Sequence, residues 1–229
     1  EYNETYQQNA FFPGALAKMG NPFIQNQFKA QAIHFFPFQY NPITQVLRVY
    51  DEIEIAVQPA DEAGSNPLTH ASPNTNALRK EMYEQQFINY GAHQDRYATI
   101  NEIGNMLVIT HGSYMDEIAP WVAWKKEKGI DVRVIDVANV PTVAAMNAYI
   151  ETMYNDETTD LTYLTLVGDE DQVPSELVTN PNGTGYCDNC FGYIAGNDHY
   201  SEIFVGRLLV HNEAELVPVI QKIMEYEKT

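Results

Sequence analysis

Cysteine and basic residues are both scarce in this chain of 229 residues, and it has no long hydrophobic run. Its only cysteines are Cys187 and Cys190, whereas a zinc site would need further Cys or His ligands at comparable spacing. In an oxidising compartment we expect this pair to form a local disulfide, and a redox-active pair is the alternative. No apolar segment approaches the ~20 residues that span a bilayer, so we expect no transmembrane segment.

The shortage of basic residues leaves the chain strongly acidic, with 13 Lys+Arg against 31 Asp+Glu and a formal net charge of −18. That balance argues against a nucleic-acid partner and against binding to anionic membranes. It is compatible with metal binding, and equally with acidity that only serves solubility. The chain opens at Glu1 with neither an initiator Met nor a signal peptide, so we expect a processed or trimmed piece of a secreted protein.

The first part of the chain has the alternation of β-strands. Apolar residues recur with period two over 47–57, and a turn signal at 41–44 separates them from an aromatic stretch at 32–39. We therefore predict that residues 1–60 are the C-terminal part of an all-β, sandwich-like module. Residues 61–96 are predicted to be a linker, rich in Pro, Ser and Asn at its start, with a helix over 77–90 closed by Gly91.

From residue 97 onward the pattern changes to alternating strands and helices. Short apolar strands are predicted at 106–110, 131–137, 163–167 and 203–205, with helices beginning near Ser113, Thr142 and Asn212. The inner stripe of the second helix is expected to be Val143, Met146, Ile150 and Met153. This order predicts an α/β fold with a parallel sheet covered by helices on both faces.

Two acidic turns follow or precede strands of this sheet. Asp169 comes directly after the third strand, and the turn GNDHYSE at residues 196–202 leads into the fourth. We expect these turns to converge and to hold Ca²⁺, which takes 6–8 oxygen ligands. The alternative is that Asp169 and Asp198 only cap turns and helices.

These motifs also carry a family resemblance. The stretches DLTYLTLVGD at 160–169, GNDHYSEIFVGR at 196–207 and DEIAPWVAWKKEKG at 116–129 resemble the gingipain-type cysteine peptidases of family C25. The segment 36–42 with Leu47-Arg-Val-Tyr50 is similar to the end of that family's prodomain. The resemblance implies part of a β prodomain followed by the first subdomain, residues 97–229, of a caspase-like catalytic domain.

The resemblance further implies specific site residues. A structural calcium site would take the side chains of Asp169, Asp198 and Glu202 and the carbonyls of Ala195 and Tyr200. A processing cut would fall between Arg96 and Tyr97, with a plain surface arginine as the alternative.

The resemblance places no catalytic residue in this chain, because the family's catalytic His and Cys belong to the second subdomain. His111-Gly112 follows the first strand of the sheet and aligns with a non-catalytic loop of the family. His199 is expected to pack or donate a hydrogen bond within the calcium turn. The partners implied are the remaining catalytic subdomain and protein or peptide substrates.

The predicted function is therefore part of the zymogen of a secreted or cell-surface bacterial gingipain-like cysteine endopeptidase, inactive as this piece alone. One alternative is a sortase-like transpeptidase of a bacterial surface-secretion system. Another is a non-catalytic, calcium-stabilised binding module.

Overall fold

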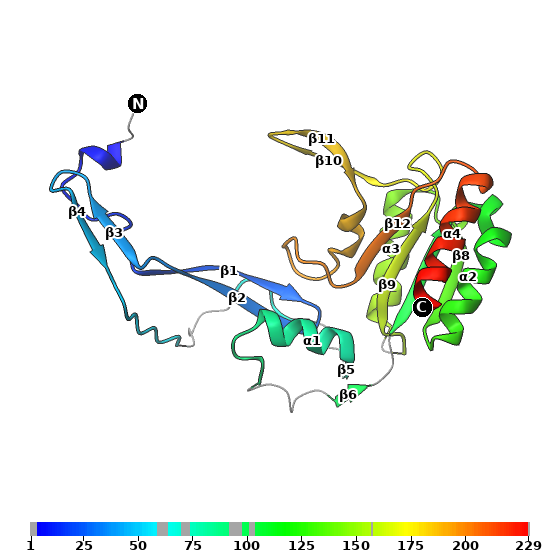
Figure 1. The fold of residues 1–229 in the computed structure, drawn as a ribbon, viewed down its shortest axis with the longest axis horizontal. Helices are drawn as coiled ribbons and strands as arrows, with labels where there is room; N and C mark the ends of the chain where they lie inside the picture. Colours follow the sequence, from blue (N-terminus) through cyan, green and yellow to red (C-terminus); the bar gives the residue numbers. More distant parts are fainter. Residues whose placement is uncertain are drawn as a thin grey trace. The chain divides into compact units, whose positions relative to one another are not determined.

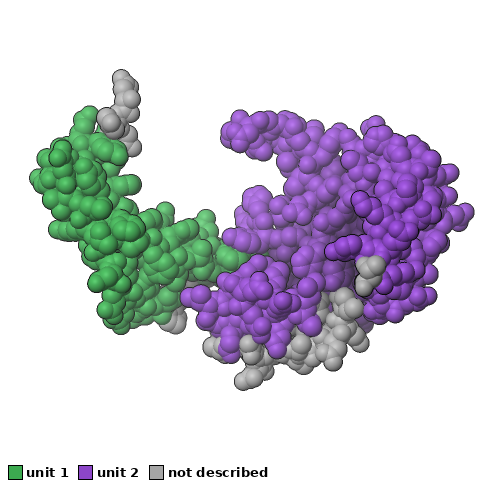
Figure 2. Space-filling model, viewed as in Figure 1, with its two compact units in different colours: residues 1–24, 28–68 green, residues 25–27, 69–229 purple. Residues whose placement is uncertain are grey.

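The computed structural model describes residues 4–58, 64–69, 74–91, 98–100, 104–156 and 158–228. The chain forms two compact units (Figure 2). Unit 1 consists of Glu1–Ile24 and Phe28–Leu68, and unit 2 of Gln25–Gln27 and Thr69–Thr229. The predicted processing residues Arg96 and Tyr97 lie outside the described residues, so that prediction stays open.

Unit 1 is built from paired strands that follow a short helix, η1 (Glu4–Gln7). Strand β1 (Ala17–Gln25) pairs with β2 (Phe28–Phe35), and β3 (Phe38–Asn41) pairs antiparallel with β4 (Val46–Val49). The predicted turn between β3 and β4 is confirmed, since Oδ1 of Asn41 accepts hydrogen bonds from the backbone N–H groups of Ile43 and Thr44. The predicted strand stops at Val49 rather than Val57, which is 60% exposed.

The centre of unit 2 is a four-stranded sheet. Its strands are β7 (Asn105–Thr110), β8 (Asp131–Asp136), β9 (Leu161–Val167) and β12 (Phe204–Leu208), in the order β12-β9-β7-β8. All three neighbouring pairs are parallel, as predicted. Parallel strands buried on both faces are almost continuously apolar, which explains the runs MLVI and, interrupted only by Thr165, LTLV.

Helices cover both faces of this sheet (Figure 1). Helix α3 (Val143–Asn155) packs with Leu107 and Ile109 on one face, while α2 (Met115–Glu127) and α4 (Glu213–Lys228) pack with Met106 and Val108 on the other. Alternate residues of β7 thus enter different cores. The hydroxyl of Thr142 caps α3, and the predicted residues Met146, Ile150 and Met153 are buried.

The other elements of unit 2 lie around this core. They are β5 (Asn74–Asn76), α1 (Ala77–Gln86), β6 (Ala98–Ile100), η3 (Gly112–Tyr114), η4 (Val137–Asn139), β10 (Glu176–Asn180), β11 (Gly183–Cys187) and η5 (Asp188–Gly192). Strands β10 and β11 form an antiparallel hairpin, and β5 pairs with β6 in parallel.

Two helix boundaries differ from the prediction, and a third confirms it. Helix α1 ends at Gln86, before Tyr90 and Gly91. Ser113 does not cap α2, because its hydroxyl is 2.9 Å from Nδ1 of His111 and the capping position is Tyr114. The cap of α4 is confirmed: Oδ1 of Asn212 accepts the backbone N–H of Glu215.

Candidate functional site

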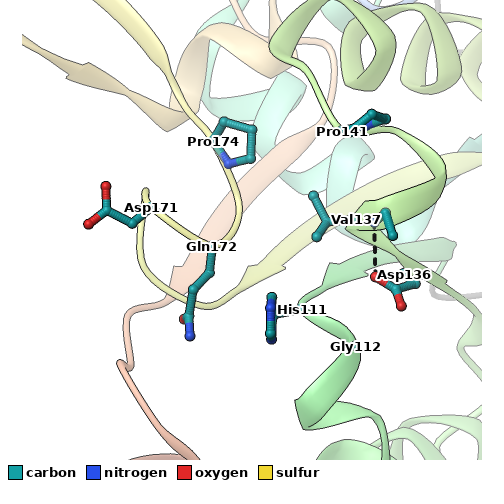
Figure 3. A pocket seen from close by; sticks show the side chains of 9 residues that line it. His111, Gly112, Asp136, Val137, Pro141, Asp171, Gln172 and Pro174 are labelled. Atoms are coloured by element: carbon teal, nitrogen blue, oxygen red, sulfur yellow. Dashed lines mark hydrogen bonds between the residues drawn. The ribbon is translucent and has the colours of Figure 1, made fainter.

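The carboxyl edge of the sheet holds a cavity of about 530 Å³. Strands β7, β8 and β9 all end at this edge, where open parallel sheets generally bind ligands. Figure 3 shows His111 at the foot of the cavity beside Gln172, while the carboxylate of Asp171 points away. The full lining is His111, Gly112, Asp136, Val137, Ala138, Pro141, Asp171, Gln172 and Pro174.

His111 has no thiol partner at this edge. Its Nδ1 is 2.9 Å from the hydroxyl of Ser113, whereas a cysteine peptidase needs an imidazole within hydrogen-bonding reach of a thiolate. Gly112 lies against Asp136, and a Cβ at that position would be 2.5 Å from the Oδ2 atom of Asp136. The loop therefore fits tightly around the end of β8 and carries no catalytic pair.

The acidic turn after β9 is held by its own hydrogen bonds. Gly168 adopts φ +129°, which permits the sharp turn, and Oε1 of Gln172 accepts from both the Tyr114 hydroxyl and the Asp169 N–H. The backbone N–H of Glu170 donates to Oδ1 of Asp169 at 2.8 Å, and the hydrogen bonding with Glu170 holds the pKa of Asp169 below its usual value. Nδ1 of His211 lies 3.6 Å from Oδ2 of Asp169.

The second acidic turn surrounds a buried carboxylate, that of Glu202, which is 3% exposed. Its Oε2 accepts the backbone N–H groups of Ile194 at 2.7 Å and Ala195 at 3.0 Å. The pKa of Glu202 is raised to about 7, mainly by burial and in smaller part by the nearby charge of Asp198, while hydrogen bonds from the backbone oppose the shift. A cation placed here would stabilise the ionised carboxylate.

The structure does not bring the two acidic turns together. Strands β9 and β12 are parallel with Phe204 opposite Tyr163 and Leu208 opposite Val167. Asp169 therefore lies beyond the carboxyl end of β9, and Glu202 lies before the amino end of β12. The length of β9 separates them, roughly 20 Å at the usual rise per residue.

The prediction that the two acidic turns converge is therefore wrong. In neighbouring parallel strands, a turn that follows one strand and a turn that precedes the other lie at opposite edges of the sheet. Within the described part of the chain, no three His, Cys, Asp or Glu side chains are grouped so that they could hold a metal ion. Asp198, Glu202 and the backbone of Ala195 and Tyr200 do share one turn.

Cys187 and Cys190 are joined as a disulfide in the structure, with their Cα atoms 5.4 Å apart. Asp188 lies between them and forms a two-point ion pair with Arg207, with Nε to Oδ2 at 2.8 Å and Nη2 to Oδ1 at 2.7 Å. The Ser175 hydroxyl also donates to Asp188. The sequence gives no sign of this role for Asp188, because its partner is 19 residues away.

Arg79 is a second residue whose role the sequence does not reveal. It is 2% exposed and donates to Asp160 and to two backbone carbonyls. An arginine in a polar helix gives no signal of burial, and its carboxylate partner is 81 residues away.

The fold and these motifs define a caspase-like α/β peptidase unit preceded by a prodomain. Two family models match the chain in this same order. A C25 propeptide model matches residues 2–97, and a peptidase family C25 model matches residues 99–229. The chain belongs to peptidase family C25. The boundary between the two matches adjoins the predicted processing residues.

The relatives are bacterial proteases. Gingipain R2 of Porphyromonas gingivalis W83 is 34% identical over 99% of this chain and 31% of its own length, and a Gingipain R1 of that species is 36% identical over 99% and 23%. The chain thus spans about a third or less of these proteins.

Solved structures show a similar fold. A complex of the P. gingivalis RgpB pro- and mature domains matches with TM-score 0.50 and 32% identity over 54% of this chain and 29% of the other. A second match, titled as the structure of a protease, has TM-score 0.51 and 29% identity over 56% and 29%. None of the helices among the described residues combines the length and the hydrophobicity that a membrane span requires.

Proposed function

We propose that this chain is the propeptide and the first catalytic subdomain of a secreted, gingipain-like cysteine endopeptidase zymogen. The observation that carries the proposal is the order of the two family matches, propeptide then peptidase, over nearly the whole chain. The relatives are gingipains, and a disulfide suits an oxidising compartment outside the cell. Protein or peptide substrates and the rest of the catalytic domain are the partners this function requires.

The chemistry of the reaction needs a thiolate and an imidazole that this chain does not pair. Both of its cysteines are in the disulfide, and His111 bonds to a hydroxyl. We therefore assign the catalytic Cys and His to sequence outside residues 1–229. The role of this subdomain is to supply the folded sheet against which the catalytic part is held.

A peptidase assay tests this function. The chain of 229 residues should not hydrolyse peptide substrates, and a protein extended with the rest of the catalytic domain should, with loss of activity after thiol alkylation. Hydrolysis by the shorter chain would overturn the assignment. An extended protein that joins peptides instead of hydrolysing them would favour the transpeptidase alternative, and a folded but inert one would favour the binding module.

We also propose that the turn before β12 binds Ca²⁺ through Asp198, Glu202 and the carbonyls of Ala195 and Tyr200, with water completing the shell. The buried Glu202 carboxylate with a second carboxylate close by supports this, because a divalent cation would offset both charges. Asp169 is not among the proposed calcium ligands, because the register of β9 and β12 places it at the opposite edge of the sheet.

Thermal unfolding with Ca²⁺ and with EDTA tests the calcium proposal. Ca²⁺ should raise the Tm of the wild-type chain, since a ligand that binds only the folded state stabilises it. The shift should disappear in Asp198→Asn and persist in Asp169→Asn, the matched control at the opposite edge. An equal loss of the shift in both variants would restore Asp169 to the site, and no shift in the wild type would end the proposal.

A further inference from the structure

The disulfide between Cys187 and Cys190 closes a loop that is too short to hold the whole fold together. Only two residues lie between the cysteines, and the stability that a disulfide contributes grows with the length of the loop that it closes. Neither cysteine belongs to the two hydrophobic cores that cover the parallel sheet. Both are partly exposed, which leaves the bond open to a thiol in solution. The disulfide therefore acts locally, on the residues within and beside its loop.

The β10–β11 hairpin leads into this loop and depends on the contacts at its foot. Figure 1 shows the hairpin extending away from the parallel sheet. Leu177 and Tyr186, which lie opposite each other, are 61% and 60% exposed. A Cβ added at Gly183 or Gly185, on the other face, would meet no atom of the described residues within 4 Å. A two-stranded hairpin without a packed face has little stability of its own.

The disulfide holds Asp188 at the foot of the hairpin. Strand β11 ends at Cys187 and Asp188 follows it, while the Ser175 hydroxyl, directly before β10, donates to Oδ1 of Asp188 at 2.7 Å. Arg207 of β12 donates to both carboxylate oxygens, at 2.8 and 2.7 Å, and its side chain is 8% exposed. Such a two-point pair requires one orientation of the carboxylate. The bonded cysteines on either side of Asp188 restrict its backbone to that orientation.

We propose that the disulfide loop, residues 187–190, is a site of thiol–disulfide exchange that controls the mobility of the β10–β11 hairpin. A thiolate of a low-molecular-weight thiol attacks one sulfur, forms a mixed disulfide and releases the other cysteine as a thiolate, which takes up a proton. A second thiolate attacks the outer sulfur of the mixed disulfide and releases the remaining cysteine. Two thiols are thereby oxidised to one external disulfide, and both cysteines are reduced to thiols.

The reduced loop no longer holds Asp188 against Arg207, so the hairpin loses its fixed foot. Without added thiol the loop stays closed. The hairpin thus responds to whether its surroundings are oxidising or reducing, while the sheet and its two cores keep their structure in both states.

Hydrogen exchange of the wild-type chain in reduced and in oxidised glutathione is the first test, with iodoacetamide trapping to report the state of the cysteines. In reduced glutathione both cysteines should be alkylated. The amides of residues 176–190 should then exchange on the order of tenfold faster, because a charge-assisted contact no longer opposes opening. The amides of β7 and α3 should not change. Cysteines that stay unmodified, or a hairpin that exchanges equally fast in both states, would overturn the proposal.

The second test separates the ion pair from the closure of the loop. The double variant Cys187→Ser with Cys190→Ser should exchange as fast as the reduced wild type and should not respond to glutathione. Asp188→Asn keeps the disulfide and should exchange faster than wild type when oxidised. Reduction should accelerate it less than wild type, because the contact through which the disulfide acts is already weakened. Asp171→Asn, in the exposed turn after β9, is the control and should respond as wild type does.

The same acceleration by reduction in Asp188→Asn as in wild type would contradict the proposal, since a disulfide that only closes the loop would act equally in both. If the double cysteine variant does not fold, the comparison of the wild-type chain in the two glutathione solutions still decides the question. The inference does not rest on the proposed function, and no readout uses peptidase activity, so its failure would leave that function standing.

Discussion

At the scale of single residues, Arg207 joins segments that are distant in the sequence. It pairs with Asp188 in the disulfide loop and donates through Nη1 to the carbonyls of Gly168 and Val173, each at 2.9 Å. The loop of Cys187 and Cys190 is thereby fixed to the turn after β9. The ion pair also fixes the orientation of the two side chains, because the planar guanidinium donates to both carboxylate oxygens.

Asp188→Asn should lower the free energy of unfolding by about 1–2 kcal/mol near pH 7, a figure reduced because the carboxylate is 32% exposed. The bonds from Arg207 hold the pKa of Asp188 below its ordinary value of 3.8. The pair's contribution is therefore present above pH 3.8 and is lost as the pH falls through the lowered pKa. Denaturant unfolding of both proteins across pH should show the difference shrinking in acid.

Asp171→Asn is the control for this variant, because Asp171 is an exposed residue of the turn after β9. Its effect should stay within about 0.5 kcal/mol at every pH. A difference between Asp188→Asn and wild type that is the same at acid and neutral pH would contradict the role given to this ion pair.

At the scale of elements, the strands and helices of the sheet could be predicted because each has a clear period. The apolar run MLVI in β7 and the apolar stripe of α3 indicate, from neighbouring residues alone, which side chains are buried. The docking of α1 could not be predicted, since its ten residues ALRKEMYEQQ are mostly polar and its buried face consists of Arg79 and Tyr83. Their partners come from the distant strand β9 and the turn before β12, which no local pattern shows.

The core between α3 and the sheet gives a prediction at this scale. Met146 is 0% exposed and belongs to the cluster with Leu107 and Leu164. Met146→Ala should cost about 2–5 kcal/mol in the free energy of unfolding, because it leaves a cavity between helix and sheet. Denaturant titration measures this cost.

Glu151→Ala, on the exposed face of the same helix, is the matched comparison and should change stability by less than about 0.5 kcal/mol. Similar midpoints for the Met146 and Glu151 variants would mean that α3 does not pack on the sheet as described.

At the scale of the whole molecule, each edge of the sheet carries a different feature. The carboxyl edge holds the cavity with His111, and the amino edge holds the Glu202 turn and the Arg79 contacts. The sequence was sufficient to recognise the family from its motifs, and it named the residues of each acidic turn. It could not show that the turns lie at opposite edges, because that depends on the parallel pairing of β9 with β12.

Covalent labelling of the catalytic cysteine tests the proposal that this chain is the non-catalytic first part of a cysteine endopeptidase. A thiol-reactive peptidyl inhibitor is added to the active, extended protein, and mass spectrometry locates the modified residue. We expect a modified cysteine outside residues 1–229, with Cys187 and Cys190 still joined in the disulfide. Inhibitor bound to Cys187 or Cys190 with parallel loss of activity would contradict it.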